Sequence, residues 1–318
     1  MKIAVIGCGR WGSLITWYLD RLGHDLTLYG RKSSVHMSRF LSERKNDLLT
    51  LPETVRLTTS LSEVADAEVI VISIASQGLR GLWQELSALK LKDKIFVLCM
   101  KGIEIDTGKR LSEISEEYAD PTCRIAVWLG PGHVQEFYAG IPNCMVIDSK
   151  DEAVKQTLVE AFSGELIRFY YGTDLVGNEV GAAAKNVVGI AAGMLDGMKL
   201  STLKGALMSR GTREIARLIV AMGGNELSAY GLCHLGDYEA TVFSPYSHNR
   251  LFGERFISGE VCDFLAEGYY TVNALVGLSE RYGVELPICQ TIYSVLYEGA
   301  DPEKALGALF HRSLKQEF

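Results

Sequence analysis

The 318-residue sequence has no paired cysteine motif, no long apolar run and no excess of basic residues. Its seven cysteines are scattered, none forms a C-x-x-C pair and their number is odd, which argues against a disulfide framework and a zinc site and favours reduced thiols. The net charge of -7 argues against nonspecific nucleic-acid binding. The longest apolar helical run, 187–195, is too short to cross a bilayer. With an apolar strand beginning at residue 2, no signal peptide is expected. We predict a cytoplasmic protein without a metal that binds neither nucleic acid nor membranes.

The sequence also lacks internal repeats, low-complexity segments and an obvious linker, although its length suggests about two domains. In the first half, apolar runs alternate with helical stretches and predict strands at 2–6, 25–29, 69–74, 94–99, 124–128 and 143–147. This alternation is typical of a parallel sheet covered on both faces. The later pattern predicts helices at 174–198, 203–222, 261–282 and 287–298. We predict an α/β fold with a Rossmann-type, mostly parallel sheet in residues 1–173, followed by an all-α domain in residues 174–318.

A glycine-spaced turn, GCGRWG, connects the first strand to the first helix. Its glycines, Gly7, Gly9 and Gly12, fit G-x-G-x-x-G. In a dinucleotide site the first glycine permits the tight turn, the second lets the backbone approach a pyrophosphate, and the third permits close packing of helix and strand. An ordinary βα turn is the alternative, but the position between strand and helix favours a dinucleotide site.

The end of the second strand bears on which nicotinamide cofactor is used. An NAD site usually has a carboxylate there, on the ribose hydroxyls. Here Tyr29 is followed by Gly30, Arg31, Lys32 and Ser33, and Arg31 is placed to pair with a 2′-phosphate. The sequence therefore favours NADP over NAD, unless Arg31 is only a solvated loop charge.

Lys185 is the most informative single residue, because it lies in the small and apolar segment GAAAKNVVG. Burying an ammonium there is unfavourable unless it is paired or functional, and desolvation moves a lysine pKa toward neutrality. Such an amine suits a proton donor and acceptor, although a lysine reaching solvent from one helix face is the alternative.

Asp237, in LGD, either orients Lys185 or caps a helix. Lys101 follows a strand at the expected ligand-binding edge of the sheet, although a lysine in such a place is more often a surface charge.

Two further segments carry groups suited to an anionic ligand. Gly130 follows another strand at the same edge and offers backbone N–H groups. The run SHNRLFG contains Ser247, His248, Asn249 and Arg250, and the arginine is a permanently charged donor fork. Spacing alone leaves a phosphate site and a solvated loop equally open.

Together these segments resemble the soluble NAD(P)-dependent glycerol-3-phosphate dehydrogenases over nearly the whole chain. The order and spacing of these segments match the family pattern, and this match is more specific than the glycine turn alone. The matching segments are GCGRWG at 7–12, KGIE at 101–104, GP at 130–131, 181–186, DG at 196–197, SRG at 209–211, GD at 236–237, NRLFG at 249–253, EGY at 267–269 and GVELPI at 283–288.

The resemblance implies interconversion of dihydroxyacetone phosphate and sn-glycerol 3-phosphate, feeding glycerophospholipid synthesis, with Lys185 as proton donor and acceptor and Lys101 and Asp237 beside it as catalytic residues. We expect direct hydride transfer from the cofactor, with Lys101 stabilising the developing charge and Asp237 orienting Lys185. The expected substrate-binding residues are Lys101, Gly130, Lys185, Asp237, Ser247, His248, Asn249 and Arg250. The expected cofactor-binding residues are Gly7, Gly9, Arg10, Trp11, Gly12, Arg31, Lys101, Val134, His248 and Glu267. A homodimer is expected on base rate alone.

Two departures from the family pattern leave the substrate open. Gly132 stands where the family has a hydroxyl residue, and His248 stands where it has an arginine. Losing a bidentate arginine is not a conservative change. The alternatives are a reductase of another ketone or hydroxy acid, and a cofactor-binding homologue that has lost catalysis. The intact Lys101, Lys185 and Asp237 favour a working reductase.

Overall fold

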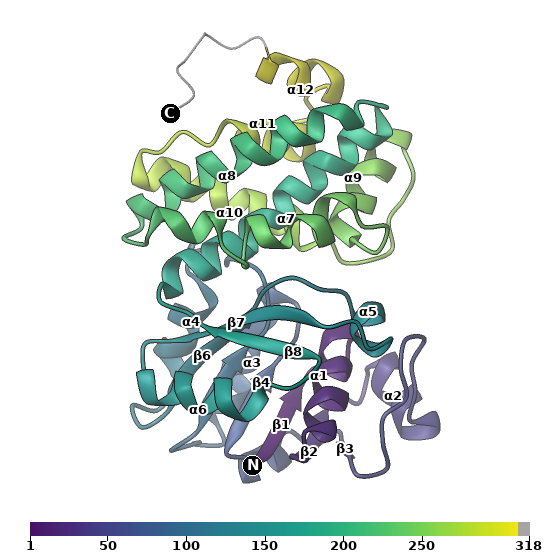
Figure 1. Ribbon diagram of the computed structural model, residues 1–318, viewed down its shortest axis with the longest axis vertical. Coiled ribbons are helices and arrows are strands. Elements are labelled where there is room, and N and C mark those ends of the chain that lie inside the picture. Colours follow the sequence, from purple (N-terminus) through teal and green to yellow (C-terminus); the bar gives the residue numbers. More distant parts are fainter. Residues whose placement is uncertain (311–318) are drawn as a thin grey trace. The chain divides into compact units, whose positions relative to one another are not determined.

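The computed structural model describes residues 1–310, which form two compact units (Figure 1). The first unit comprises Met1–Lys101 and Lys109–Glu179, and the second comprises Gly102–Gly108 and the residues from Val180 onward. Among the described residues, no helix combines the length and apolar character needed to span a membrane.

The first unit is built on one eight-stranded sheet in the order β3-β2-β1-β4-β5-β6-β7-β8. Its strands are β1 (Lys2–Ile6), β2 (Asp25–Tyr29), β3 (Arg56–Thr58), β4 (Val69–Ile72), β5 (Ile95–Leu98), β6 (Arg124–Leu129), β7 (Asn143–Ser149) and β8 (Ile167–Tyr171). All neighbours are parallel except β6 and β7. In register, Ile6 of β1 lies opposite Tyr29 and Ile72, so the carboxyl ends of the strands that flank the glycine turn are level.

Helices cover both faces of this sheet, which confirms the predicted Rossmann-type architecture. The unit contains α1 (Arg10–Arg21), α2 (Val35–Glu43), α3 (Leu79–Ser87), α4 (Leu111–Tyr118), α5 (Val134–Tyr138), α6 (Glu152–Phe162) and the short turns η1 (Leu61–Asp66) and η2 (Ser76–Gly78). Apolar side chains of α1, α2, α5 and α6 share one core with alternate residues of the strands, such as Val5, Leu28 and Val71. On the other face, the Trp83 ring of α3 lies 4.6 Å from Phe96 of β5.

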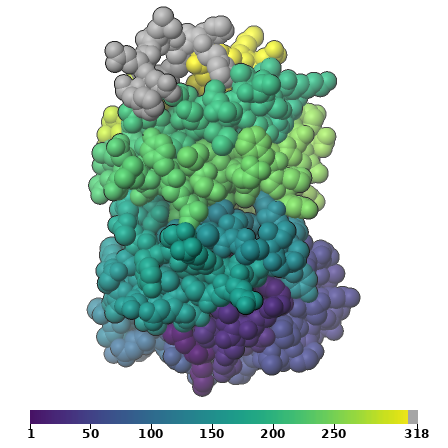
Figure 2. All heavy atoms as spheres, viewed as in Figure 1, coloured from purple at the N-terminus to yellow at the C-terminus, as the bar shows by residue number. Residues whose placement is uncertain are grey.

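The N-terminal βα unit is fastened to α6 and the strand that follows it, far along the chain. Tyr18 donates a 2.6 Å hydrogen bond from its hydroxyl to the Phe162 carbonyl, and His24 Nε2 lies 2.9 Å from the Ala161 carbonyl oxygen. In Figure 2 the purple N-terminal atoms accordingly adjoin teal atoms of this part of the unit. These bonds hold the strand and helix that flank the glycine turn.

The second unit is helical. It contains most of α7 (Leu175–Gly197), followed by η3 (Ser201–Leu203), α8 (Lys204–Ala221), η4 (Glu226–Tyr230), η5 (Leu235–Asp237), η6 (Glu239–Phe243, a π-helical turn), α9 (His248–Ser258), α10 (Glu267–Tyr282), α11 (Pro287–Tyr297) and α12 (Pro302–Phe310). The glycines of α7 permit close helix packing: a Cβ on Gly193 would lie 1.8 Å from the Arg250 carbonyl oxygen of α9. Residues 180–195 of α7 are buried, as its composition predicts.

Three local expectations differ from the structure. The helix predicted over 261–282 begins only at Glu267, because the preceding chain is extended and packs Phe264 against the His248 ring at 4.8 Å. The run from His248 is not a loop but the first turn of α9, with Ser247 as its N-cap. The strands β3 and β8 carry no long apolar run and were not predicted.

Candidate functional site

The glycine turn has a different physical reason for each glycine. Gly7 has φ +112°, and a Cβ there would lie 2.1 Å from the Ser73 carbonyl oxygen. A Cβ on Gly12 would lie 1.8 Å from the Gly7 oxygen, whereas a Cβ on Gly9 would meet nothing within 4 Å. Packing therefore requires glycine at positions 7 and 12, whereas the space beside Gly9 is open. Gly9 lies at the N-terminus of α1, where no side chain caps the helix. This opening fits a pyrophosphate that approaches the backbone.

Lys101, Trp11 and Gly130 come together beside this turn. Lys101 Nζ donates a 2.7 Å hydrogen bond to the Gly130 carbonyl and lies 5.8 Å from the centre of the Trp11 ring. Gly130, at the end of β6, has φ +134°, a left-handed conformation that glycine adopts readily. Three residues predicted separately from the sequence thus form one group on three elements of the first unit.

The remaining predicted cofactor residues of this unit lie on α1, after β2 and on α5. Arg10, at the start of α1, donates a 3.2 Å hydrogen bond to Gln135, and burial lowers its pKa. Arg31 follows β2, and its guanidinium lies 3.5 Å from Glu85 with 63% of the side chain exposed. Val134, the first residue of α5, is buried. An exposed guanidinium after β2 is suited to a 2′-phosphate.

Lys185 lies on α7 and is only 7% exposed. Its Nζ is 2.8 Å from Asp237 Oδ2 and donates a 2.6 Å hydrogen bond to the Thr241 hydroxyl. The predicted partnership of Lys185 and Asp237 is therefore present in the geometry. The carboxylate and the hydroxyl hold this buried ammonium in one place.

Thr241 is the member of this cluster that we did not identify from the sequence. Its hydroxyl donates a 2.7 Å hydrogen bond to the Asp237 carbonyl and accepts one from Lys185. Such bonding to the carbonyl four residues earlier is common for threonine in helical turns. The only signal in the sequence is a hydroxyl residue four places after Asp237, which is too frequent a spacing to single it out.

The start of α9 brings several predicted substrate residues close to α7. The Ser247 hydroxyl accepts a 3.3 Å hydrogen bond from the Arg250 backbone. Asn249 Nδ2 donates a 3.0 Å hydrogen bond to Asn186, the neighbour of Lys185. Asn249 Oδ1 accepts from Gly268 N at 2.9 Å, directly after Glu267 at the start of α10. Asn249 therefore joins three helices, and His248 begins the same turn of α9.

The side chain of Arg250 is directed at a carboxylate of the protein. Its Nη1 lies 2.7 Å from Asp196 and 3.1 Å from Glu254, and Lys204 Nζ lies 2.5 Å from the same Asp196 oxygen. Burial alone would raise the pKa of Asp196, but hydrogen bonds from Lys204, Ser201 and Arg250 outweigh it and lower that pKa. This cluster joins α7, α8 and α9, and substrate binding by Arg250 stays a prediction.

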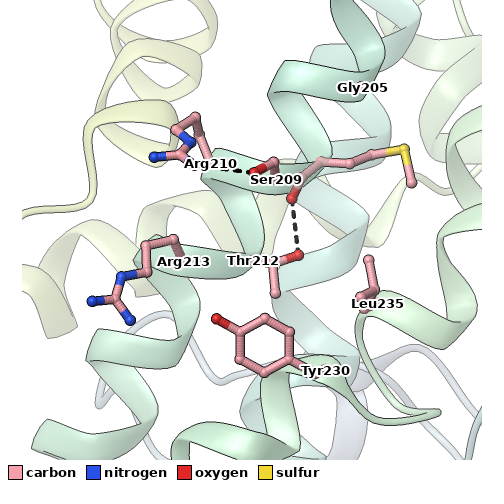
Figure 3. Close-up of a pocket in the computed structure, with 8 residues that line it drawn as sticks. Gly205, Ser209, Arg210, Thr212, Arg213, Tyr230 and Leu235 are labelled. Atoms are coloured by element: carbon pink, nitrogen blue, oxygen red, sulfur yellow. Dashed lines mark hydrogen bonds between the residues drawn. The ribbon is translucent and has the colours of Figure 1, made fainter. Parts of the chain in front are cut away.

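The second unit also has a hollow beside α8, with a volume of about 360 Å³ (Figure 3). Arg210 and Arg213 project to the same side of the helix there, and Tyr230 faces them. None of the predicted catalytic or binding residues lines this hollow. Within residues 1–310 there is also no group of three or more histidine, cysteine, aspartate or glutamate residues suited to hold a metal ion.

Two family models match successive parts of the chain. Residues 2–155 match the family model described as NAD-dependent glycerol-3-phosphate dehydrogenase N-terminus, and residues 174–307 match the corresponding C-terminus model. A glycerol-3-phosphate dehydrogenase [NAD(P)+] from Streptomyces avermitilis is 38% identical over 330 residues, covering 100% of this chain and 98% of that protein. The Thermoanaerobacter sp. (strain X514) protein of the same name is 35% identical, covering 100% and 99%.

Solved structures give the same result. The glycerol-3-phosphate dehydrogenase from Coxiella burnetii matches with a TM-score of 0.91 and 27% identity, covering 98% of this chain and 99% of that one. A 2-dehydropantoate 2-reductase from Methylococcus capsulatus, with a TM-score of 0.62 and 18% identity, shares the fold alone. The chain belongs to the NAD-dependent glycerol-3-phosphate dehydrogenase family.

Proposed function

We propose that this protein interconverts dihydroxyacetone phosphate and sn-glycerol 3-phosphate with NADP(H) or NAD(H). The observation that carries the proposal is the buried Lys185 amine, 2.8 Å from Asp237 and 2.6 Å from Thr241. Reduction of a ketone needs a proton at the oxygen as the carbon takes up hydride. Lys185 supplies that proton, and Asp237 holds the ammonium in place.

The cofactor part of the proposal rests on the first unit, for which we keep the limits 1–173. When bound, the nicotinamide gives or takes the hydride. The open backbone at Gly9 and the N-terminus of α1 would hold the pyrophosphate, with Arg10, Trp11 and Val134 beside it. Arg31 would pair with a 2′-phosphate, which favours NADP.

The substrate part of the proposal rests on residues 174–318 and on the Lys101 group. Ser247, His248 and Asn249 form the first turn of α9, whose N-terminal N–H groups favour a phosphate. Lys101 adds a positive charge for the developing alkoxide. A homodimer and a cytoplasmic location belong to the same proposal; the seven cysteines, all free thiols, support a reducing compartment.

The test is oxidation of NADPH with dihydroxyacetone phosphate, repeated with NADH. We expect turnover with both cofactors and a preference for NADPH. Replacing Arg31 by alanine should weaken NADPH binding about tenfold and leave NADH binding unchanged, because one charge-assisted hydrogen bond is lost. No turnover with either cofactor would contradict the activity, and equal losses for both cofactors would contradict the role of Arg31.

One observation favours a second candidate, reduction of a different ketone. Gly132 has φ +135°, and a Cβ there would lie 2.3 Å from the Phe137 ring. No hydroxyl side chain fits at this position without movement of Phe137. This candidate predicts faster turnover with a 2-oxo acid than with dihydroxyacetone phosphate, and the reverse order would exclude it.

A further inference from the structure

His234 is a fully buried histidine on the segment that carries Asp237. Its Nδ1 lies 2.8 Å from the Gly181 carbonyl oxygen, and its Nε2 lies 2.8 Å from the Tyr238 hydroxyl. A carbonyl oxygen can only accept, so Nδ1 carries the proton and Nε2 accepts from Tyr238. In a neutral ring the two contacts therefore require one tautomer.

The contacts of His234 and Asp237 connect their segment to α7 at two places, Gly181 and Lys185. The Asp237 backbone N–H donates a 3.0 Å hydrogen bond to the His234 carbonyl, and the Asp237 carboxylate meets Lys185 at 2.8 Å. Gly181 precedes Lys185 by about one helical turn on α7. The imidazole thus ties the Asp237 segment to α7 one turn before the amine that Asp237 must reach.

The residues that surround the His234 ring leave just enough space for it. A Cβ on Gly181 would lie 2.9 Å from the Cβ of His234, so a side chain at 181 would push the histidine away from α7. Tyr238 is fully buried, and its ring packs edge-on against the imidazole at 4.9 Å. Its hydroxyl lies 3.3 Å from the Cβ position of Gly211 on α8. The histidine is thereby confined between α7 and the Asp237 segment.

The ring stays neutral beside a cation. Burial, together with the nearby charge of Lys185, lowers the pKa of His234 to about 4. A neutral imidazole keeps the lone pair that Tyr238 needs and does not compete with Lys185 for the Asp237 carboxylate.

We propose that His234 is the positioning residue for the Lys185–Asp237 pair, acting through its Nδ1–H bond to the Gly181 carbonyl. The inference rests on the proposed function, because its main readout is the proton transfer assigned to Lys185. A histidine that only fills the core would contribute to stability and leave the rate of the folded enzyme unchanged.

The decisive experiment compares His234→Asn with His234→Gln. An asparagine amide takes the place of Nδ1 and restores the bond to Gly181, whereas a glutamine amide takes the place of Nε2. We expect His234→Gln and His234→Ala to lower kcat about 100-fold, with KM little changed, since a small misplacement near the chemistry has effects of this size. We expect His234→Asn to retain most of the kcat. Equal kcat values for the Asn and Gln variants would overturn the proposal.

Gly181→Ala supplies a second test that keeps the histidine. The added methyl group should displace the ring and lower kcat about tenfold. Ile292→Ala, at a buried position of α11, is the matched control: it should lower the melting temperature and leave kcat unchanged. If Gly181→Ala keeps full kcat, Nδ1 does not set the geometry and the proposal fails.

Nitrogen NMR of the His234 ring separates this inference from the proposed activity. We expect an Nδ1-protonated neutral ring at pH 6, whether or not the protein turns over dihydroxyacetone phosphate. An Nε2-protonated or charged ring would overturn the inference. A wild-type protein without turnover but with the expected tautomer would overturn the proposed function and leave the His234 geometry established.

Discussion

Two buried clusters in the helical unit each contain a lysine and an aspartate, but they differ in how the charges meet. Lys185 lies between the Asp237 carboxylate and the Thr241 hydroxyl. In the other cluster the Asp196 carboxylate lies between two cations, Lys204 at 2.5 Å and Arg250 at 2.7 Å. One cluster centres on an ammonium and the other on a carboxylate.

This difference suggests an experiment that separates catalysis from stability. The bonds of Asp196 connect α7, α8 and α9, and each of them holds two helices together. The contacts of Asp237 and Thr241, by contrast, meet at the single ammonium of Lys185. We therefore expect the Lys185 cluster to govern turnover and the Asp196 cluster to govern the free energy of unfolding.

Replacing Lys185 by alanine should have the largest effect. We expect kcat to fall about 10³-fold, within the range for loss of a general acid, while NADPH affinity changes little. NADPH oxidation and a fluorescence titration measure the two quantities. Lys304→Ala, at an exposed position of α12, is the matched control. Turnover that survives in Lys185→Ala would remove the distinction between the clusters.

Substitutions of the two aspartates, Asp196 and Asp237, should have opposite effects on stability and turnover. Asp196→Asn should lower the free energy of unfolding by about 3–5 kcal/mol, because two largely buried cations lose their carboxylate. Asp237→Asn should chiefly lower kcat. Chemical denaturation and steady-state kinetics on both variants test this. If Asp237→Asn loses stability but keeps kcat, the assignment of the clusters is reversed.

Glu214 is a third buried acid, whose carboxylate accepts hydrogen bonds from the backbone of Ile288 and Cys289 at the start of α11. Burial raises its pKa to about 7. The folded state therefore holds this proton more tightly than the unfolded state. The resulting stabilisation is fully present below about pH 4.5 and is lost as the pH rises through 7, by up to ~1.4 kcal/mol per pH unit.

We expect Glu214→Gln to flatten the pH dependence of the free energy of unfolding between pH 5 and 7. Urea denaturation at several pH values measures the slope. A slope equal to that of the wild type would show that another group titrates there.

The smallest effect is expected at Thr241. Thr241→Val keeps the shape but removes the hydroxyl that accepts from Lys185, and should lower kcat about tenfold. Thr271→Val, which removes a buried hydroxyl of α10 that bonds Glu267, is the matched control. Equal kcat values for the two variants would show that the Thr241 hydroxyl does not contribute to turnover.

Much of the fold could be predicted because its signals are local. The apolar runs of β4 and β5 are buried on both faces of the sheet, and such strands can be identified from composition. β3 has only three residues, and in β8 the exposed Arg168, Tyr170 and Tyr171 interrupt the apolar pattern. These two strands form the edges of the sheet.

Some residues of the candidate site likewise have a local signal in the sequence, and others have none. Lys185 can be identified from the sequence because burying a charge among small, apolar residues is unfavourable unless the charge is paired or functional. The glycine turn can be identified because its spacing fits the contacts of a dinucleotide-binding turn. Thr241 and His234 have no such local signal, since their partners on α7 lie 56 and 53 residues away in the chain.

The sequence by itself determined the alternation of strands and helices, the glycine-spaced turn before α1 and the presence of a lysine in a small, apolar helical segment. Only the tertiary structure decided which groups meet that amine, and that Arg250 is directed at Asp196. The physical reason is range: periodicity and backbone conformation are set within a few residues, whereas a hydrogen bond between distant segments exists only after packing has fixed both.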